Sequence, residues 1–189
     1  MSSTSTTFAQ SCAHEAGHAA SALCLGLSPL LATVLPELGK GARVDLAPPP
    51  PGEHSLDLIW RWMIFGHSGA LAQTRFTLDS DGLLRRSRIA YESALLDDID
   101  TWKNAEALSF RLGCRRPAEM SHKRAIFYAA RRAAKQLLRE HEVLVMRIRD
   151  ELDQQPNVSG ERLQQLFEDD RIFATSVPGL ICLCSKSST

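Results

Sequence analysis

The spacing of two histidines in residues 11–25, SCAHEAGHAASALCL, constrains this chain more than any other feature. His14 and His18 are four residues apart, so on a helix their imidazoles share one face and converge on a point that a zinc ion can occupy. Glu15 lies beside the first histidine on the same side. There its carboxylate can accept a proton from a metal-bound water without being a ligand itself. The pattern therefore predicts a helix that carries a metal site.

The residues around this motif favour a helix that begins near Thr6 or Thr7 and ends at Gly26. An apolar stripe on the opposite side is expected to face the core, and it consists of Phe8, Cys12, Ala16, Ala19 and Leu23. The alternative is an amphipathic, alanine-rich helix whose two histidines are solvated or buried in the core. That alternative leaves the charged Glu15 between two histidines without an explanation.

A tetrahedral zinc site with two histidines and one open position needs a third protein ligand, and a carboxylate is the usual choice. Three acidic residues, Asp97, Asp98 and Asp100, lie in one short stretch. The apolar spacing after them predicts a helix that begins here, with Asp97 as the N-cap, and ends at Gly113. Capping and the helix dipole account for two of these acids. This acidic helix start is the predicted source of the third ligand, and the choice among the three carboxylates stays open.

The remaining patterns predict one mostly helical α+β domain over residues 1–176, followed by a C-terminal tail over 177–189. Short apolar or alternating runs at Ala32–Leu35 and Arg43–Leu46 predict a small β-hairpin next to the histidine helix. Helical periodicity and capping residues predict three further helices, over Leu56–Arg75 after the cap Ser55, over residues 121–155, and after Ser159.

His67 and His141 are further histidines that lie in these predicted helices. His67 is part of a run of small residues, Gly66–Ala72, which lets another helix approach closely. It could reach the site and steady an oxyanion, although a satisfied or exposed histidine is the commoner case. His141 lies on the apolar stripe of the long helix over 121–155, where we expect a hydrogen-bonded core histidine.

Charge and hydropathy argue against several classes of partner. Lys plus Arg and Asp plus Glu number 22 each, so no net field recruits nucleic acid or anionic lipid. The N-terminus has no signal-peptide pattern, and Arg61 interrupts the best apolar run, so no membrane segment is expected. Five cysteines at unrelated spacings favour a reducing cytoplasm over a disulfide framework. The local basic run Arg111–Arg139 reads as a solvated helix face.

Several segments resemble the peptidase domain of the FtsH-type ATP-dependent zinc metalloproteases. The HEAGHAA run, His14–Ala20, is similar to that family's HEAGHA signature, and residues 32–44 are similar to its strand and glycine-rich hairpin. Phe65–Phe76 looks like its small-residue helix, and Gln136–Leu166 looks like its C-terminal helix pair. The resemblance covers most of Phe8–Phe167, and the first motif is its most specific part.

In that family the third zinc ligand is an aspartate at the start of a helix, in an Asn-Asp-Ile or Asp-Leu context. The resemblance implies His14, His18 and Asp98 as zinc ligands, Glu15 as the general base and Asp97 in the capping place. The chain lacks the phosphate-binding loop, the ATPase domain and the membrane anchor of the full-length proteases. We therefore expect action on unfolded or short polypeptides, or dependence on an ATPase partner in trans. The proteases of that family work as hexamers, and whether this chain forms an oligomer stays open.

The leading expectation is a zinc-dependent endopeptidase with a polypeptide substrate. The first rival is a catalytically silent metal-binding relative that acts as a protein-interaction module, which predicts bound zinc without chelator-sensitive cleavage. The second rival is a helical nucleic-acid binder that uses Arg111–Arg139, which predicts salt-dependent retention on nucleic acid whether or not His14 is present.

Overall fold

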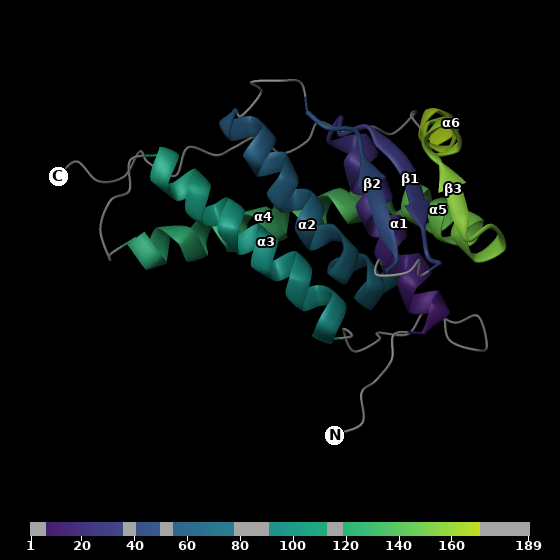
Figure 1. Cartoon of the computed structure of the whole chain (residues 1–189), viewed down its shortest axis with the longest axis horizontal. Helices are drawn as coiled ribbons and strands as arrows, with labels where there is room; N and C mark the ends of the chain where they lie inside the picture. Colours follow the sequence, from purple (N-terminus) through teal and green to yellow (C-terminus); the bar gives the residue numbers. More distant parts are fainter. Residues whose placement is uncertain (1–6, 36–40, 50–54, 78–90, 113–118, 171–189) are drawn as a thin grey trace.

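The computed structural model describes residues 7–35, 41–49, 55–77, 91–112 and 119–170. It is mostly helical with a small antiparallel sheet, which confirms the predicted mostly α (α+β) class (Figure 1). The described elements in chain order are α1 (Phe8–Cys24), β1 (Pro29–Thr33), β2 (Arg43–Leu46), α2 (Leu56–Phe76), α3 (Tyr91–Arg111), α4 (Glu119–Glu140), α5 (Glu142–Gln154), β3 (Asn157–Ser159) and α6 (Gly160–Asp170). The predicted tail over 177–189 lies outside the described residues.

Helix α1 lies at the centre of the fold. Its N-terminus is closed by a capping box, in which the Thr7 side chain accepts from the backbone N–H of Gln10 and the Gln10 side chain accepts from that of Thr7. The chain leaves the helix through Gly26, whose φ of 67° favours glycine. Four of the five residues of the predicted apolar stripe, from Cys12 to Leu23, lie in the core, whereas Phe8 is 45 % exposed. The other faces of α1 are covered too, because every residue from Cys12 to Leu23 is buried.

Small residues let α1 and α2 approach closely, as the run Gly66–Ala72 predicts. A Cβ atom added to Gly17 of α1 would overlap the Ala72 Cβ and lie 2.6 Å from the Ser68 carbonyl oxygen. A Cβ on Gly66 would overlap the Thr101 hydroxyl, so α3 also packs tightly on α2. These contacts place α2 between α1 and α3, close to the histidine face of α1 (Figure 1).

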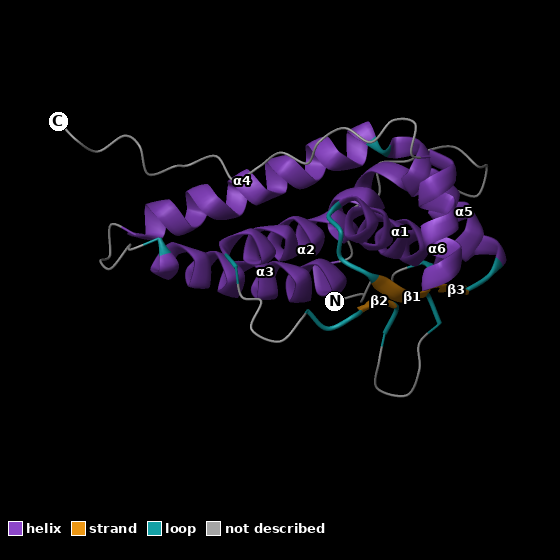
Figure 2. Cartoon of the chain, turned by 90° about the horizontal axis from the view of Figure 1, so that it is seen from above, coloured by secondary structure: helices purple, strands orange, loops and turns teal. Residues whose placement is uncertain are grey.

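The three strands form an antiparallel sheet in the order β2-β1-β3, and Figure 2 shows it on one side of the helices. Strands β1 and β2 are the predicted hairpin, with Ala32 opposite Val44. The sequence patterns miss β3, which pairs Val158 with Ala32 from the other side. Strand β2 is therefore an edge of the sheet, and it packs against α1.

The long helix predicted over 121–155 is wrong as one element, because the chain breaks at His141 into α4 and α5. The break redirects the apolar stripe. Buried residues of α4 such as Ile126 and Ala130 join the core between α2 and α3, whereas Leu144 and Ile148 of α5 join the core around α1 and the sheet. The apolar spacing continues across the break, so periodicity alone does not reveal it.

Within the described residues, no helix combines the length and the apolar character that a bilayer-spanning segment requires.

Candidate metal centre

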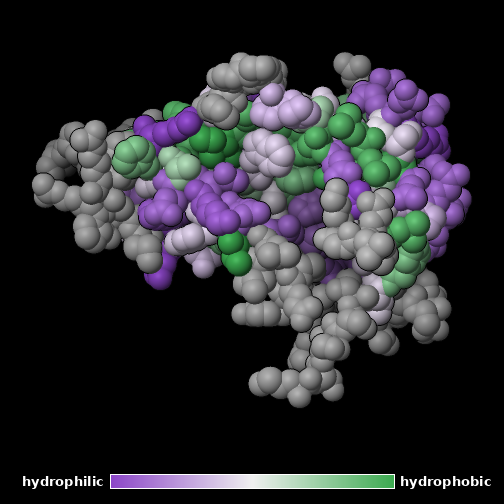
Figure 3. Space-filling view, viewed as in Figure 1, coloured by the Kyte–Doolittle hydropathy of each residue, from purple (hydrophilic) through white to green (hydrophobic). Residues whose placement is uncertain are grey.

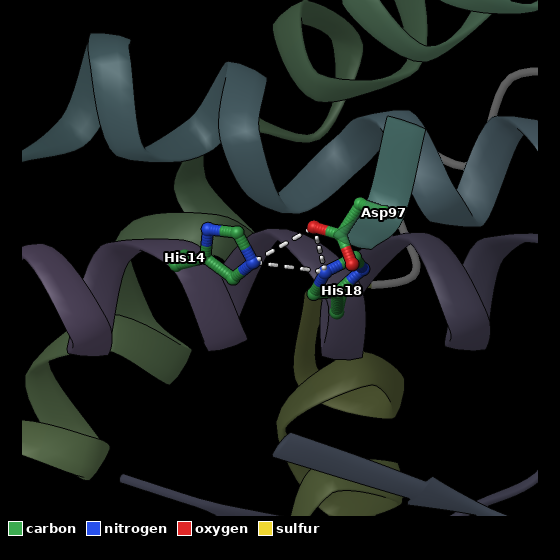
Figure 4. Close-up of side chains that lie close together, drawn as sticks. All are labelled: His14, His18 and Asp97. Atoms are coloured by element: carbon green, nitrogen blue, oxygen red, sulfur yellow. Dashed lines mark hydrogen bonds and ion pairs between the residues drawn. The ribbon is translucent and has the colours of Figure 1, made fainter. Parts of the chain in front are cut away.

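Two histidines of α1 and one aspartate of α3 converge on a single point, as Figure 4 shows. The His14 Nε2 atom lies 3.1 Å from the His18 Nε2 atom and 3.1 Å from the Asp97 Oδ2 atom. The third separation, from His18 Nε2 to Asp97 Oδ2, is 3.3 Å. We call His14 Nε2, His18 Nε2 and Asp97 Oδ2 the three-donor group.

Helix α2 orients both imidazoles through their other ring nitrogens. The His18 Nδ1–H donates to the Phe65 carbonyl oxygen at 2.9 Å, since a carbonyl oxygen can only accept. The His14 Nδ1–H donates to the Gln73 side-chain oxygen at 3.1 Å. These partners select the tautomer in which each Nε2 carries a lone pair. Two lone pairs and a carboxylate oxygen then face one another, and a proton or a metal ion between them would relieve their repulsion.

The spacing of the three-donor group fits a small tetrahedral cation. Zinc binds imidazole and carboxylate at about 2.0–2.1 Å, which separates any two tetrahedral ligands by roughly 3.3 Å. The observed separations of 3.1, 3.1 and 3.3 Å form one face of such a tetrahedron. The nitrogen and oxygen donors are also those that zinc commonly takes in sites with an open position.

Charge interactions within the group also favour positive charge between its members. Burial lowers the pKa of His14, but the hydrogen bond to Asp97 and the nearby Glu15 charge outweigh it, and the resulting pKa lies above the ordinary value. Burial raises the pKa of Asp97, but its contacts with His14 and His18 outweigh burial and place the pKa well below the ordinary value. The site therefore stabilises positive charge among its donors, and a proton and a metal ion compete for that place.

Glu15 lies next to the three-donor group and is 4 % exposed. Its Oε2 atom has no hydrogen-bond partner among the described residues. Burial raises the pKa of the Glu15 carboxyl above its ordinary value, while His18 and His14 act against that rise. A buried carboxylate oxygen without a donor is costly, so this position favours a bound water or substrate group that supplies a proton.

The structure brings Asp97, and not Asp98, to the two histidines. Asp98, which the resemblance implies as the third ligand, lies outside the three-donor group. Its side chain is 46 % exposed and lies 3.6 Å from His67 Nδ1. Asp100 pairs with Lys103 at the surface, at 2.9 Å. Helix α3 begins at Tyr91, so Asp97 is an interior helical residue and not an N-cap.

Helical phase explains why Asp97 is the inward residue. Asp97, Thr101, Ala105 and Leu108 follow a 4-4-3 spacing, and the last three are at most 1 % exposed. Asp98 is about 100° further round the helix, which carries its side chain away from α1. The spacing alone does not select Asp97, because steps of three or four residues back from Leu108 also reach Asp98.

His67 and His141 are not part of the three-donor group. His67 is 2 % exposed, and its Nε2 atom lies 3.2 Å from the Phe127 carbonyl oxygen of α4. His67 is thus a buried, hydrogen-bonded histidine, the commoner of the two cases considered, and its hydrogen bond is directed to α4 and not to the site. His141 is buried at the junction of α4 and α5, and burial lowers its pKa.

No protein-family model matches this chain, and no curated protein matches it either. The resemblance to the FtsH-type peptidase domain stays a prediction. The function has to be inferred from the geometry of the described side chains.

Gly69 of α2 lies directly against the three-donor group. A Cβ atom at this position would overlap His18 Nε2 and lie 2.6 Å from His14 Nε2. Only a glycine therefore leaves room for both rings in their observed places. The low bulk of the run Gly66–Ala72 predicts close helix packing but does not by itself predict this contact with the ligands.

We expect Gly69→Ala to weaken zinc binding by about 10- to 100-fold, the range seen when ligand-orienting groups are altered. The added methyl group displaces the imidazoles, while alanine suits a helix interior better than glycine by about 1 kcal/mol, so the fold should persist. Competition titration with a zinc indicator measures the affinity. Gly41→Ala is the matched control, because nothing lies within 4 Å of a Cβ there. Equal affinities in the two variants would contradict the predicted role of Gly69.

Proposed function

We propose that this protein is a zinc-dependent endopeptidase that hydrolyses peptide bonds of unfolded or short polypeptides. One observation carries the proposal. Three donor atoms from two helices form one face of a zinc-sized tetrahedron, with the partnerless carboxylate oxygen of Glu15 beside them. A structural metal site would have a fourth protein ligand, whereas a catalytic one keeps a position open. Among the described residues, His14, His18 and Asp97 are the three that would hold the ion.

Zinc bound there would polarise the scissile carbonyl and make water acidic near neutral pH. The residues of the chain then have distinct tasks. Glu15 accepts a proton from the attacking water and passes it to the leaving amine nitrogen. Its raised pKa suits both steps, because the group has to take and release a proton near neutral pH. Gln73 and Phe65 hold the two imidazoles in place through their Nδ1–H groups.

The edge strand β2 offers a place for an extended substrate. In the described sheet its only strand partner is β1, so an extended peptide would add to the sheet at the other edge of β2. Strand β2 contacts α1, and the Arg43 charge acts against the raised pKa of the Glu15 carboxyl, which supports a substrate position near the site. Pairing of this kind needs an extended chain, and that favours unfolded or short polypeptides as substrates.

The proposal includes a location in a reducing compartment, the cytoplasm. Cys12 and Cys24 are free thiols, which fits a reducing compartment such as the cytoplasm. A folded substrate would have to be unfolded first, and an ATPase partner in trans would supply that step.

Metal content and chelator sensitivity test the proposed function together. We expect elemental analysis of the purified chain to find about one zinc per molecule. Cleavage of a permanently unfolded protein, such as a reduced and alkylated one, should stop with a chelator and return with added zinc. Bound zinc without cleavage would favour the silent metal-binding relative. Absence of both would contradict the proposal.

A further inference from the structure

A cavity of about 490 Å³ adjoins the three-donor group. It lies between the first half of α2 and the middle of α3, with Pro49 at one end. Its α2 wall is apolar and consists of Leu58, Ile59, Trp62 and Phe65. Figure 3 shows hydrophobic surface over the first part of α2 beside hydrophilic surface of α3. The volume is in the range of sites that enclose small ligands, and it exceeds one large side chain.

Two residues connect this cavity to the candidate metal centre. Asp97 lines the cavity and also supplies the carboxylate of the three-donor group. The Phe65 ring lines the cavity and contacts the His18 ring, with 4.6 Å between ring centroids. A group bound in the cavity would therefore lie next to the ligands themselves, separated from His18 by one aromatic ring.

The chemistry of the walls selects the kind of group that fits. Trp62 and Phe65 meet edge to face at 5.6 Å, an arrangement that accommodates a further aromatic ring. Two charged residues of the lining, Asp100 and Lys103, pair with each other at 2.9 Å. Asp97 repels an acidic side chain. An apolar side chain of phenylalanine, leucine or methionine size therefore suits the cavity better than a charged one.

We propose that this cavity binds a bulky apolar side chain of the polypeptide substrate, on a residue beside the bond that is cut. The inference rests on the proposed endopeptidase function, because it assigns the cavity to the same substrate. It makes the protein selective for sequence positions next to large apolar residues, which unfolded chains expose and folded proteins bury.

Binding to the metal-free full-length chain tests the cavity without relying on catalysis. Two fluorescein-labelled peptides of eight residues, identical except for phenylalanine or alanine at one central position, are titrated by fluorescence anisotropy. We expect the phenylalanine peptide to bind at least about tenfold more tightly, since an apolar pocket discriminates by roughly 10- to 200-fold for small size differences. Equal affinities would overturn the proposal.

Filling the cavity should remove this preference. Asn104 of α3 is half-buried and lines the cavity, so Asn104→Trp places an indole in it. Ala107→Trp is the matched control, because Ala107 is exposed one turn further along α3 and does not line the cavity. We expect the preference to fall below about twofold in Asn104→Trp and to persist in Ala107→Trp. Trp62→Ala opens the wall and should also reduce it. A preference that survives both cavity variants would overturn the assignment.

Cleavage by the zinc-loaded protein separates the two proposals. Mass spectrometry of a digested unfolded protein should place most cuts beside large apolar residues, and Asn104→Trp should redistribute them. Cuts without this preference would overturn the cavity assignment and leave the endopeptidase function standing. If no cuts occur and yet the metal-free protein prefers the phenylalanine peptide, the cavity assignment holds as a peptide-binding site and the endopeptidase function fails.

Discussion

Glu15→Gln should lose cleavage of an unfolded protein by about 100- to 10,000-fold, the usual contribution of a general acid–base group. Glutamine has the shape of glutamate but cannot accept the proton of the attacking water. The zinc content should stay at the wild-type level, because Glu15 is not among the three donors. Stability should not fall, since burial already disfavours the charged form of this carboxyl. Initial rates and elemental analysis of the same preparation measure both effects.

Glu142→Gln is the matched control for this change. Glu142 lies on α5 and pairs with Arg75 at the surface, so its replacement removes a carboxylate without touching the site. We expect the control to retain wild-type activity. Full activity in Glu15→Gln would contradict the assignment of the general base, and loss of zinc in that variant would show that Glu15 acts as a ligand.

Asp97→Ala should reduce zinc affinity by more than about 100-fold, because it removes a direct ligand, whereas altering a group that only orients a ligand costs at most about that much. The remaining His14 and His18 would leave two positions without protein ligands. Asp97 is 25 % exposed, so truncation to alanine creates no large internal cavity and the fold should persist. Zinc affinity is measured by indicator competition, and helical content by circular dichroism.

Asp98→Ala is the neighbouring control. It distinguishes the ligand set seen in the structure, with Asp97, from the set that the family resemblance implies, with Asp98. The structure predicts that this variant binds zinc as the wild type does, because the Asp98 carboxylate contacts His67 and not the histidines of α1. The resemblance implies the opposite result. Zinc loss in Asp98→Ala together with normal binding in Asp97→Ala would contradict the site described above.

The local part of the site could be predicted from the sequence. The four-residue spacing of His14 and His18 needs only helical geometry to bring the rings together, and the adjacent Glu15 follows from the same helix. The hairpin of β1 and β2 was also predictable, because its strands are neighbours in the chain and pair antiparallel. Whether the group binds metal stays a prediction.

The third donor could not be selected from local patterns. Asp97 lies 79 residues after His18, and which acid faces inward depends on where α3 begins. Placing the helix start at the acidic cluster put Asp97 in the cap, whereas the helix begins at Tyr91 and turns Asp97 towards α1. A phase error of one residue is enough to exchange Asp97 for Asp98.

Long-range packing decided the remaining differences. Strand β3 has three residues and pairs with β1, where Thr33 contacts Asn157 across a sequence separation of 124 residues. Because the chain breaks at His141, the apolar residues of α4 and of α5 pack into two different core clusters. Neither feature has a periodicity of its own in the sequence.

Helix α2 holds both imidazoles from behind, through Gln73 and the Phe65 carbonyl. The rings are thus preorganised, and little conformational entropy is lost when an ion arrives. Both ligands therefore depend on the position of α2. A substitution that tilts or shifts this helix would misalign His14 and His18 together, even if the substituted residue lies far from either of them.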